Sequence, residues 1–290
     1  MQTEARKKPG KYFLSDNPIS QSLSPSVFIA SSPSFHLPLP PKHLFLSKMI
    51  LSTKGIVLHC KDYSETSIIA RVFTEQLGLQ TYIAKGVRKK GSRIKRNLFA
   101  QLSVIQLVAN HKEGEGMRVI RDASCEYQLN GIATDMAKTA VSIYISELLT
   151  RSVSAQMADP NLYGYIEDAI LNLDRANGSV AGFPLAFTIG LTQFLGFDPH
   201  NNFSDNNSYF DMEEGHFCPN PPGHPYYLSS PLSNSLSEVL TTLNAGITAI
   251  RINSVVRNEL LAGMLEYFRI HIAGFGEIKS VRVLSDVLND

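Results

Sequence analysis

The sequence predicts an α+β protein of more than one domain, in which a small five-stranded β-barrel precedes an α-helical domain. Its length of 290 residues corresponds to about two domains at roughly 150 residues each. Short β-rich runs fill residues 49–125, whereas apolar residues recur with a helical period over 126–290. The charge divides at nearly the same place. Residues 49–120 carry 12 basic and 5 acidic side chains (net +7), and residues 121–290 carry 9 and 19 (net −10).

The composition argues against several classes of protein. A chain that is 43% hydrophobic and 18% charged is typical of globular proteins. Since no stretch approaches 18 consecutive apolar residues, we expect no membrane-spanning helix and no membrane partner. Three scattered cysteines are too few for a disulfide framework, and their odd number suits a reducing compartment.

Residues 1–48 differ from the rest of the chain. They contain nine Ser and seven Pro and show no sustained apolar period, which predicts a disordered tail. The alternative that we favour is an extension from an upstream start codon, with the native start at Met49. A secretory signal is not expected, because no apolar core of roughly 7–15 residues follows the basic residues near the N-terminus. The segment is basic and Ser-rich, as transit peptides are, but this match is one of composition only.

Five short runs predict the strands of the barrel. Each is rich in Val, Ile, Tyr or Phe and is bounded by Gly, Asp, Ser or Asn. A hairpin turn is expected at 75–78. The runs span residues 55–60, 67–73, 79–85 and 102–108, with a fifth that opens at 117–120. This strand count is that of an oligonucleotide-binding (OB) barrel, so we expect a nucleic-acid-binding domain over 49–125.

The segment between the third and fourth predicted strands, residues 85–96, is strongly basic. Seven of its twelve residues are basic and none is acidic. A flexible cationic loop beside a barrel can neutralise phosphates without reading sequence, and bases could stack on Tyr82, Phe73 or Phe99. The alternatives are a solvated loop and a short basic targeting signal. The expected nucleic-acid-binding residues are Lys54, Arg71, Lys85, Arg88, Lys89, Lys90, Arg93, Lys95 and Arg96.

The remainder of the chain predicts five or six helices. One apolar face is formed by Ala137, Val141, Tyr144, Ile145 and Leu148. Asp159-Pro160 predicts the start of a second helix, and Gly196 ends a third. A proline-rich stretch, 197–231, predicts a long loop that interrupts the helical domain of residues 126–290. Beyond it, a capping box at Ser235-x-x-Glu238 predicts the start of a fourth helix, and further helices are expected through 261–272 and over 280–288.

No pattern in the sequence supports catalysis. Residues 274–280 lack the spacing of a phosphate-binding loop, and no G-x-S-x-G motif is present. The carboxylates of Asp211, Glu213 and Glu214 have no second acidic cluster with which to build a two-metal site. The proline-rich stretch has four potential zinc ligands but no close cysteine pair, so we expect neither a metal nor another cofactor. These four are His200, His216, Cys218 and His224.

Several segments, in this order and spacing, make the chain resemble the RecO family of bacterial recombination mediators. The resemblance covers about 49–290 and excludes the first 48 residues. The segments that carry it include Gly55-Ile56-Val57-Leu58, Asp62-Tyr63-Ser64-Glu65-Thr66-Ser67, Ala84-Lys85-Gly86-Val87-Arg88, Tyr144-Ile145-Ser146-Glu147-Leu148-Leu149-Thr150-Arg151, Phe194-Leu195-Gly196-Phe197, Leu265-Glu266-Tyr267-Phe268-Arg269 and Ile278-Lys279-Ser280.

The resemblance implies an OB barrel on a helical domain with a zinc-ribbon-like insertion. It implies binding of single- and double-stranded DNA, annealing of complementary strands and, with RecR, loading of RecA onto DNA covered by single-stranded DNA-binding protein (SSB). A cytoplasmic, nucleoid-associated, non-enzymatic protein would follow. The C-terminal tail of SSB would bind the helical domain near Tyr144, Leu148, Phe187, Leu191 and Arg257.

Two departures from the family pattern matter. The insertion has Cys218 where many members have four cysteines, so the zinc site looks lost. Leu185 stands where some members place an arginine, which puts the ionic part of the tail pocket in doubt. Tyr144 and Phe187 could also be plain core residues. The alternative function is a protein-interaction adaptor that uses its helical body for docking and does not bind DNA.

Overall fold

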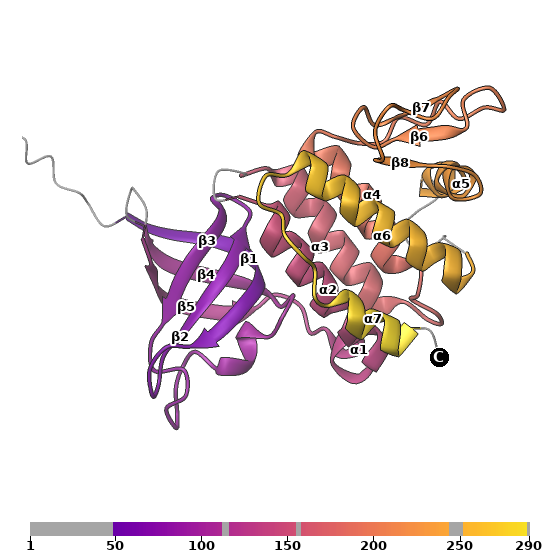
Figure 1. Ribbon diagram of the computed structural model, residues 1–290. Coiled ribbons are helices and arrows are strands. Elements are labelled where there is room, and N and C mark those ends of the chain that lie inside the picture. Colours follow the sequence, from indigo (N-terminus) through magenta and orange to yellow (C-terminus); the bar gives the residue numbers. More distant parts are fainter. Residues whose placement is uncertain (1–48, 112–115, 155–157, 244–251, 289–290) are drawn as a thin grey trace, which may run out of the picture. The chain divides into compact units, whose positions relative to one another are not determined.

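A computed structural model of the chain describes residues 49–111, 116–154, 158–243 and 252–288 (Figure 1). The tail or upstream extension expected for residues 1–48 lies outside these described residues. The described residues belong to one compact unit, residues 46–290. None of their helices combines the length and the hydrophobicity needed to cross a lipid bilayer.

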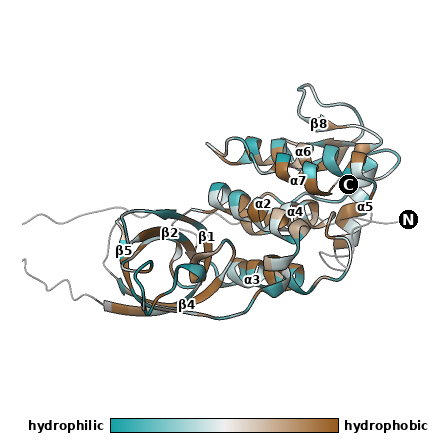
Figure 2. Ribbon diagram, turned by 90° about the horizontal axis from the view of Figure 1, so that it is seen from below, coloured by the Kyte–Doolittle hydropathy of each residue, from teal (hydrophilic) through white to brown (hydrophobic). Residues whose placement is uncertain are grey.

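Five strands form a closed barrel in the order β1-β2-β3-β5-β4, which confirms the predicted OB-like fold. β3 and β5 run parallel and close the barrel, whereas the other neighbouring strands are antiparallel. The hydrophobic residues of β4 are visible in Figure 2. The strands are β1 (Met49–Asp62), β2 (Ile68–Thr74), β3 (Gly78–Ala84), β4 (Val104–His111) and β5 (Arg118–Cys125), and a short 3-10 helix, η1 (Arg96–Phe99), precedes β4.

β1 is longer than the predicted run because it serves two partners. Its first half pairs with β4, from Met49 to Ile56, and its second half pairs with β2 from Gly55 onward. Gly55 lies where the two pairings overlap. A Cβ atom at this position would lie 2.5 Å from Cγ1 of Val72, so the close approach of β1 and β2 requires glycine.

The barrel contributes to two hydrophobic cores. One fills its interior and includes Val57, Val72 and Tyr82. The other is the core of the helical domain, to which Ile56, Leu58 and Phe73 belong although they lie on barrel strands. Consecutive buried residues at 56–58 fit a strand that is covered on both faces. One wall of the barrel is therefore part of the helical core.

Seven helices lie among the described residues, one or two more than predicted. Asp135 caps α2 by accepting hydrogen bonds from the backbone N–H groups of Ala137 and Lys138, and Asp159 caps α3 as predicted. Gly196 ends α4 with φ of 84°, also as predicted. The helices are α1 (Asn130–Thr134), α2 (Met136–Ser152), α3 (Pro160–Arg175), α4 (Phe183–Leu195), α5 (Leu232–Leu243), α6 (Ser254–His271) and α7 (Val281–Leu288).

The residues that precede α7 are held by a carboxylate from α2. Glu147 accepts hydrogen bonds from the backbone N–H groups of Lys279, at 3.1 Å, and Ser280, at 2.8 Å. Burial raises the pKa of Glu147, but the hydrogen bonds from Ser280 and Lys279 and the charge of Arg151 outweigh this and lower it overall. The ionised carboxylate of Glu147 thus fixes the start of the last helix.

The proline-rich stretch is more ordered than its local pattern predicts. It contains a three-stranded sheet of order β7-β6-β8, which suits the ribbon-like insertion that the resemblance implies, and strands of two or three residues are too short to give a periodic pattern. The predicted capping box at Ser235 is wrong, because α5 begins three residues before Ser235, whose N–H donates to the carbonyl of Pro231. The strands are β6 (Tyr209–Asp211), β7 (His216–Cys218) and β8 (Tyr227–Leu228).

Candidate nucleic-acid interface

The basic segment 85–96 is anchored to the barrel at several points. Val87 and Ile94 alternate with its cations and are buried in the barrel core, as is Phe99 just beyond it. The backbone N–H of Arg88 donates to the carbonyl of Thr66, and Lys89 and Ser92 close two tight turns. The sequence suggested a flexible loop, but these buried side chains and backbone bonds hold it against the barrel.

All seven basic side chains of this segment are exposed, yet they differ in their partners. Each of the three arginines contacts a carboxylate: Asp62 lies 3.0 Å from Arg88 and 3.2 Å from Arg96, and Asp122 lies 2.5 Å from Arg93. Two carboxylates against seven cations leave a net charge of 7 − 2 = +5. Four of the cations have no ion-pair partner within the described part of the chain, namely Lys85, Lys89, Lys90 and Lys95.

Part of the segment forms one side of an open hollow on the barrel. Arg121, on β5, adds a further positive charge to the lining of this hollow. Its guanidinium is oriented by a hydrogen bond to the side chain of Asn110. No carboxylate lies among the described residues that line the hollow. Positive charge gathered in a concave surface attracts phosphate groups. The basic residues that line it are Lys85, Lys89, Lys90, Arg93 and Arg121.

Arg121 was not among the predicted site residues. Strand alternation places a polar residue at this position on the outer surface of the barrel, but alternation does not say which loop lies beside it. Its approach to segment 85–96 depends on the parallel pairing of β3 with β5, in which Tyr82 is opposite Arg118. That pairing brings together residues far apart in sequence and leaves no local signal.

Two of the predicted site residues lie apart from this hollow. Nζ of Lys54 lies 3.5 Å from Glu126 and 3.4 Å from Glu167 of α3. Burial lowers the pKa of Lys54, but the neighbouring carboxylates outweigh this effect and raise it overall. Arg71 lines a different groove, between the barrel and α2, together with His59 and Arg151.

The rings expected to stack with bases are not accessible. Phe73, Tyr82 and Phe99 have exposed fractions of 0%, 0% and 3%. Phe73 stacks on Tyr163 of α3, and burial raises the pKa of Tyr82 to about 12. The prediction that these three rings contact bases is therefore wrong, because Phe73 on β2, Tyr82 on β3 and Phe99 on η1 all face a hydrophobic core.

The four apolar residues expected to hold a partner's tail are also in the core. Tyr144, Leu148, Phe187 and Leu191 each have an exposed fraction of 0%. The hydroxyl groups of Tyr144 and Thr188 are hydrogen bonded at 2.6 Å. α2 and α4 are buried on more than one face. The apolar period of these helices, which could have indicated a surface groove, therefore indicates a face that packs in the core. These four side chains cannot line a surface pocket in this conformation.

Arg257 lies elsewhere, at a small crevice between α4, α6 and α7. Pro184 and Leu185 line it from α4 and Leu261 from α6, while Leu284 and Leu288 of α7 lie on its other side. The Arg257 guanidinium donates a hydrogen bond to the carbonyl of Leu288. A cation thus borders an apolar crevice, as an anionic apolar peptide would require, although the crevice is narrow and the last helix partly fills it.

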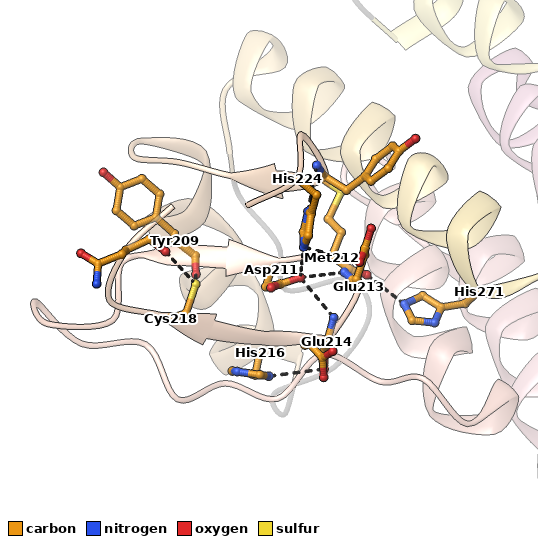
Figure 3. Close-up of polar contacts among 11 residues, drawn as sticks. Tyr209, Asp211, Met212, Glu213, Glu214, His216, Cys218, His224 and His271 are labelled. Atoms are coloured by element: carbon orange, nitrogen blue, oxygen red, sulfur yellow. Dashed lines mark hydrogen bonds and ion pairs between the residues drawn. The ribbon is translucent and has the colours of Figure 1, made fainter. Parts of the chain in front are cut away.

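Three of the four potential zinc ligands of the insertion, His216, Cys218 and His224, point in different directions (Figure 3). The Cys218 thiol donates to the carbonyls of Tyr209 and Asn220, and burial raises its pKa. Nε2 of His224 instead lies 3.4 Å from the Asp211 carboxylate. Among the described residues, no three His, Cys, Asp or Glu side chains are placed to hold a metal ion. The residues present do not fit the zinc site that the resemblance implies.

Comparison with known proteins gives concordant matches over both parts of the chain. The family model described as recombination protein O N terminal matches residues 49–128, and the one described as recombination protein O C terminal matches residues 133–280. Three relatives are named DNA repair protein RecO. The chain is 28% identical to that of Azobacteroides pseudotrichonymphae over 241 residues (83% of this chain, 100% of the relative). It is 29% identical to that of Christiangramia forsetii over 240 residues (82% and 99%) and 28% to that of Bacteroides fragilis over 242 (83% and 100%).

Proposed function

The chain belongs to the RecO family of DNA repair proteins, and from this we propose that its barrel binds single- and double-stranded DNA. It would anneal complementary strands and, with RecR, help load RecA onto single-stranded DNA covered by SSB. The observation that carries the proposal is the cationic hollow formed by segment 85–96 and Arg121. We expect no enzymatic activity, no cofactor requirement, and a location on the nucleoid in the cytoplasm.

Contacts of this kind suit annealing. Lysine and arginine side chains on the hollow would hold phosphates and leave the pairing edges of the bases free. If each of the five lining cations contacts one phosphate, the logarithm of the binding constant should fall with that of salt concentration. The expected slope is about −3.5 for a single strand and about −4.5 for a duplex. An adaptor that does not bind DNA would show no such dependence.

Docking of the SSB tail on the helical domain is the second part of the proposal. An acidic and hydrophobic peptide needs a cation beside an apolar surface, and the crevice places Arg257 beside Leu185 and Leu261. These three residues have exposed fractions of 8%, 0% and 5%, so a peptide would have to displace α7 to reach them. The residues of this crevice replace the buried Tyr144 and Phe187 as the expected contacts. Leu185 carries no charge, so Arg257 would supply the ionic contact.

The test is charge reversal on the hollow. In Lys89→Glu/Lys90→Glu, two exposed lysines without ion-pair partners among the described residues become acidic. We expect weaker binding of both DNA forms and slower annealing of complementary oligonucleotides. Arg175→Glu/Arg282→Glu is the matched control, because it makes the same change in charge on the helical domain. Unchanged binding and annealing in the first variant would refute the proposed interface.

A further inference from the structure

One aromatic residue of the barrel segment is exposed. Residues 49–125 contain four aromatic side chains, and Phe73, Tyr82 and Phe99 are buried. The fourth, Tyr63, has an exposed fraction of 56%. An isolated exposed ring is ordinary on a protein surface, so its meaning depends on what surrounds it.

Tyr63 lies in the turn between β1 and β2, which is hydrogen bonded in several places. The N–H groups of Tyr63 and Ser64 both donate to the carbonyl of Ser67, at 3.0 and 3.3 Å. Arg88 donates from its guanidinium to the Ser64 carbonyl and to Asp62, the residue before the tyrosine. The backbone on either side of Tyr63 is therefore fixed, while its ring remains exposed to solvent.

The same contacts join this turn to the basic segment. Asp62 binds both Arg88 and Arg96, which lie on segment 85–96, while Lys85, Lys89 and Lys90 of that segment line the cationic hollow. A nucleic-acid strand whose phosphates occupy the hollow would thus have an exposed aromatic ring at the neighbouring turn. Aromatic rings beside a cationic track are the common platform for unpaired bases, because every base has a π-face.

We propose that Tyr63 stacks against an unpaired base of single-stranded DNA bound along segment 85–96. The proposal rests on the proposed function and adds a residue that distinguishes single strands from duplexes. Within a duplex both faces of each base are already stacked on neighbouring bases, so no base face is free to stack against the Tyr63 ring. The contact would not depend on base identity, and stacking leaves the pairing edge of the base accessible for annealing.

The first test compares Tyr63→Ala with Tyr63→Phe in fluorescence anisotropy titrations, using a labelled oligo(dT) and a duplex of equal length. We expect Tyr63→Ala to weaken binding of the single strand about tenfold, within the range for loss of one stacked base, and to change duplex binding less than about twofold. Tyr63→Phe should bind as the wild type does. Tyr226→Ala is the matched control, because Tyr226 has an exposed fraction of 41% but lies in the insertion.

Equal weakening of single-strand and duplex binding by Tyr63→Ala would overturn the stacking contact. Unchanged binding would also overturn it and would favour a protein partner for this ring. Either outcome, with DNA binding intact in the wild type, leaves the proposed function standing. Absence of DNA binding by the wild type would refute the proposed function itself.

The second test uses the absence of tryptophan from the sequence. Tyr63→Trp introduces a single tryptophan at the proposed contact, and Tyr226→Trp introduces one at the control position. Stacking with a base quenches indole emission, so oligo(dT) should quench the first variant and leave the second unchanged. Equal responses of the two variants, or no response in Tyr63→Trp although the oligonucleotide binds, would overturn the proposal.

Discussion

Asp62→Asn should strengthen DNA binding. The Asp62 carboxylate lies 3.0 Å from Arg88 and 3.2 Å from Arg96, and its side chain has an exposed fraction of 50%. Exposed ion pairs contribute up to about 1 kcal/mol each, so the carboxylate competes only weakly with a phosphate for these two arginines. It also repels a nearby phosphate by about 1 kcal/mol at 4 Å in water. The asparagine is of similar size and carries no charge.

Removing the competition and the repulsion together should favour binding by about 1–2 kcal/mol, which is about five- to thirtyfold at low salt. Two additional phosphate contacts should steepen the salt dependence by about 1.4 for a single strand. The free energy of unfolding should fall by no more than about 2 kcal/mol, since two exposed ion pairs are lost. Anisotropy titrations of oligo(dT) at several salt concentrations would measure the first two effects, and urea denaturation the third.

Asp122→Asn provides an internal comparison. Asp122 pairs with one arginine, Arg93, which already lines the hollow, so its replacement should give a smaller gain and little change in the salt dependence. Glu277→Gln, next to Arg282 on the helical domain, should change neither quantity. Weaker binding in Asp62→Asn would refute the reasoning, because it would mean that the carboxylate orients the arginines for phosphate. Unchanged binding would mean that Arg88 and Arg96 do not reach DNA.

Three further predictions concern the helical domain and its contact with the barrel. Glu167→Gln removes the closer carboxylate from Lys54 and should lower the free energy of unfolding, measured by urea denaturation, by about 1 kcal/mol. DNA affinity should stay unchanged. An altered DNA affinity would instead favour a DNA contact at Lys54. The lowered pKa of Glu147 stabilises the fold above the ordinary carboxyl pKa, near 4.3, and this stabilisation is lost as the pH falls through the lower pKa of the folded state. Glu147→Gln should therefore destabilise the protein at pH 7 and much less at about pH 3, and equal destabilisation at both would contradict the role of the ionised carboxylate. Arg257→Ala should weaken the binding of an acidic peptide that ends in Phe, as measured by calorimetry. Leu148→Ala should instead lower the free energy of unfolding by about 2–5 kcal/mol and have little effect on the affinity for that peptide.

Local patterns predicted much of the fold. Strand runs, the turn at 75–78, and the caps at Asp159 and Gly196 all depend on neighbouring residues and are confirmed. Which face of a strand or helix is covered depends instead on distant partners. The sequence around Tyr82 and Phe73 allows either ring to lie on the exposed face of a half-buried strand. In the structure Tyr82 faces the barrel core and Phe73 faces the core of the helical domain. The sheet of the insertion was missed because its strands are too short to show a period.

The candidate site was predicted in part. Segment 85–96 could be found because its charge is contiguous in the sequence, and each of its cations is exposed in the structure. The net charge around the segment also depends on Asp62, Asp122 and Arg121. These residues lie on β1 and β5, so the sequence of the segment itself does not reveal their effect. The same holds for Lys54, whose partner Glu167 is 113 residues away. In the sequence, Tyr63 stands out only as part of a family motif, because its exposure depends on the fold.

The barrel wall that belongs to the helical core limits how far the two parts can be treated as modules. Residues 49–125 expressed alone would expose Ile56, Leu58 and Phe73, which are buried in the complete chain. Such a fragment would present an apolar patch prone to self-association, so it would not be an autonomous folding unit. Barrel and helices should instead unfold in one cooperative transition. A substitution in α2 or α3 can then abolish DNA binding by unfolding the barrel, without lying near any nucleotide.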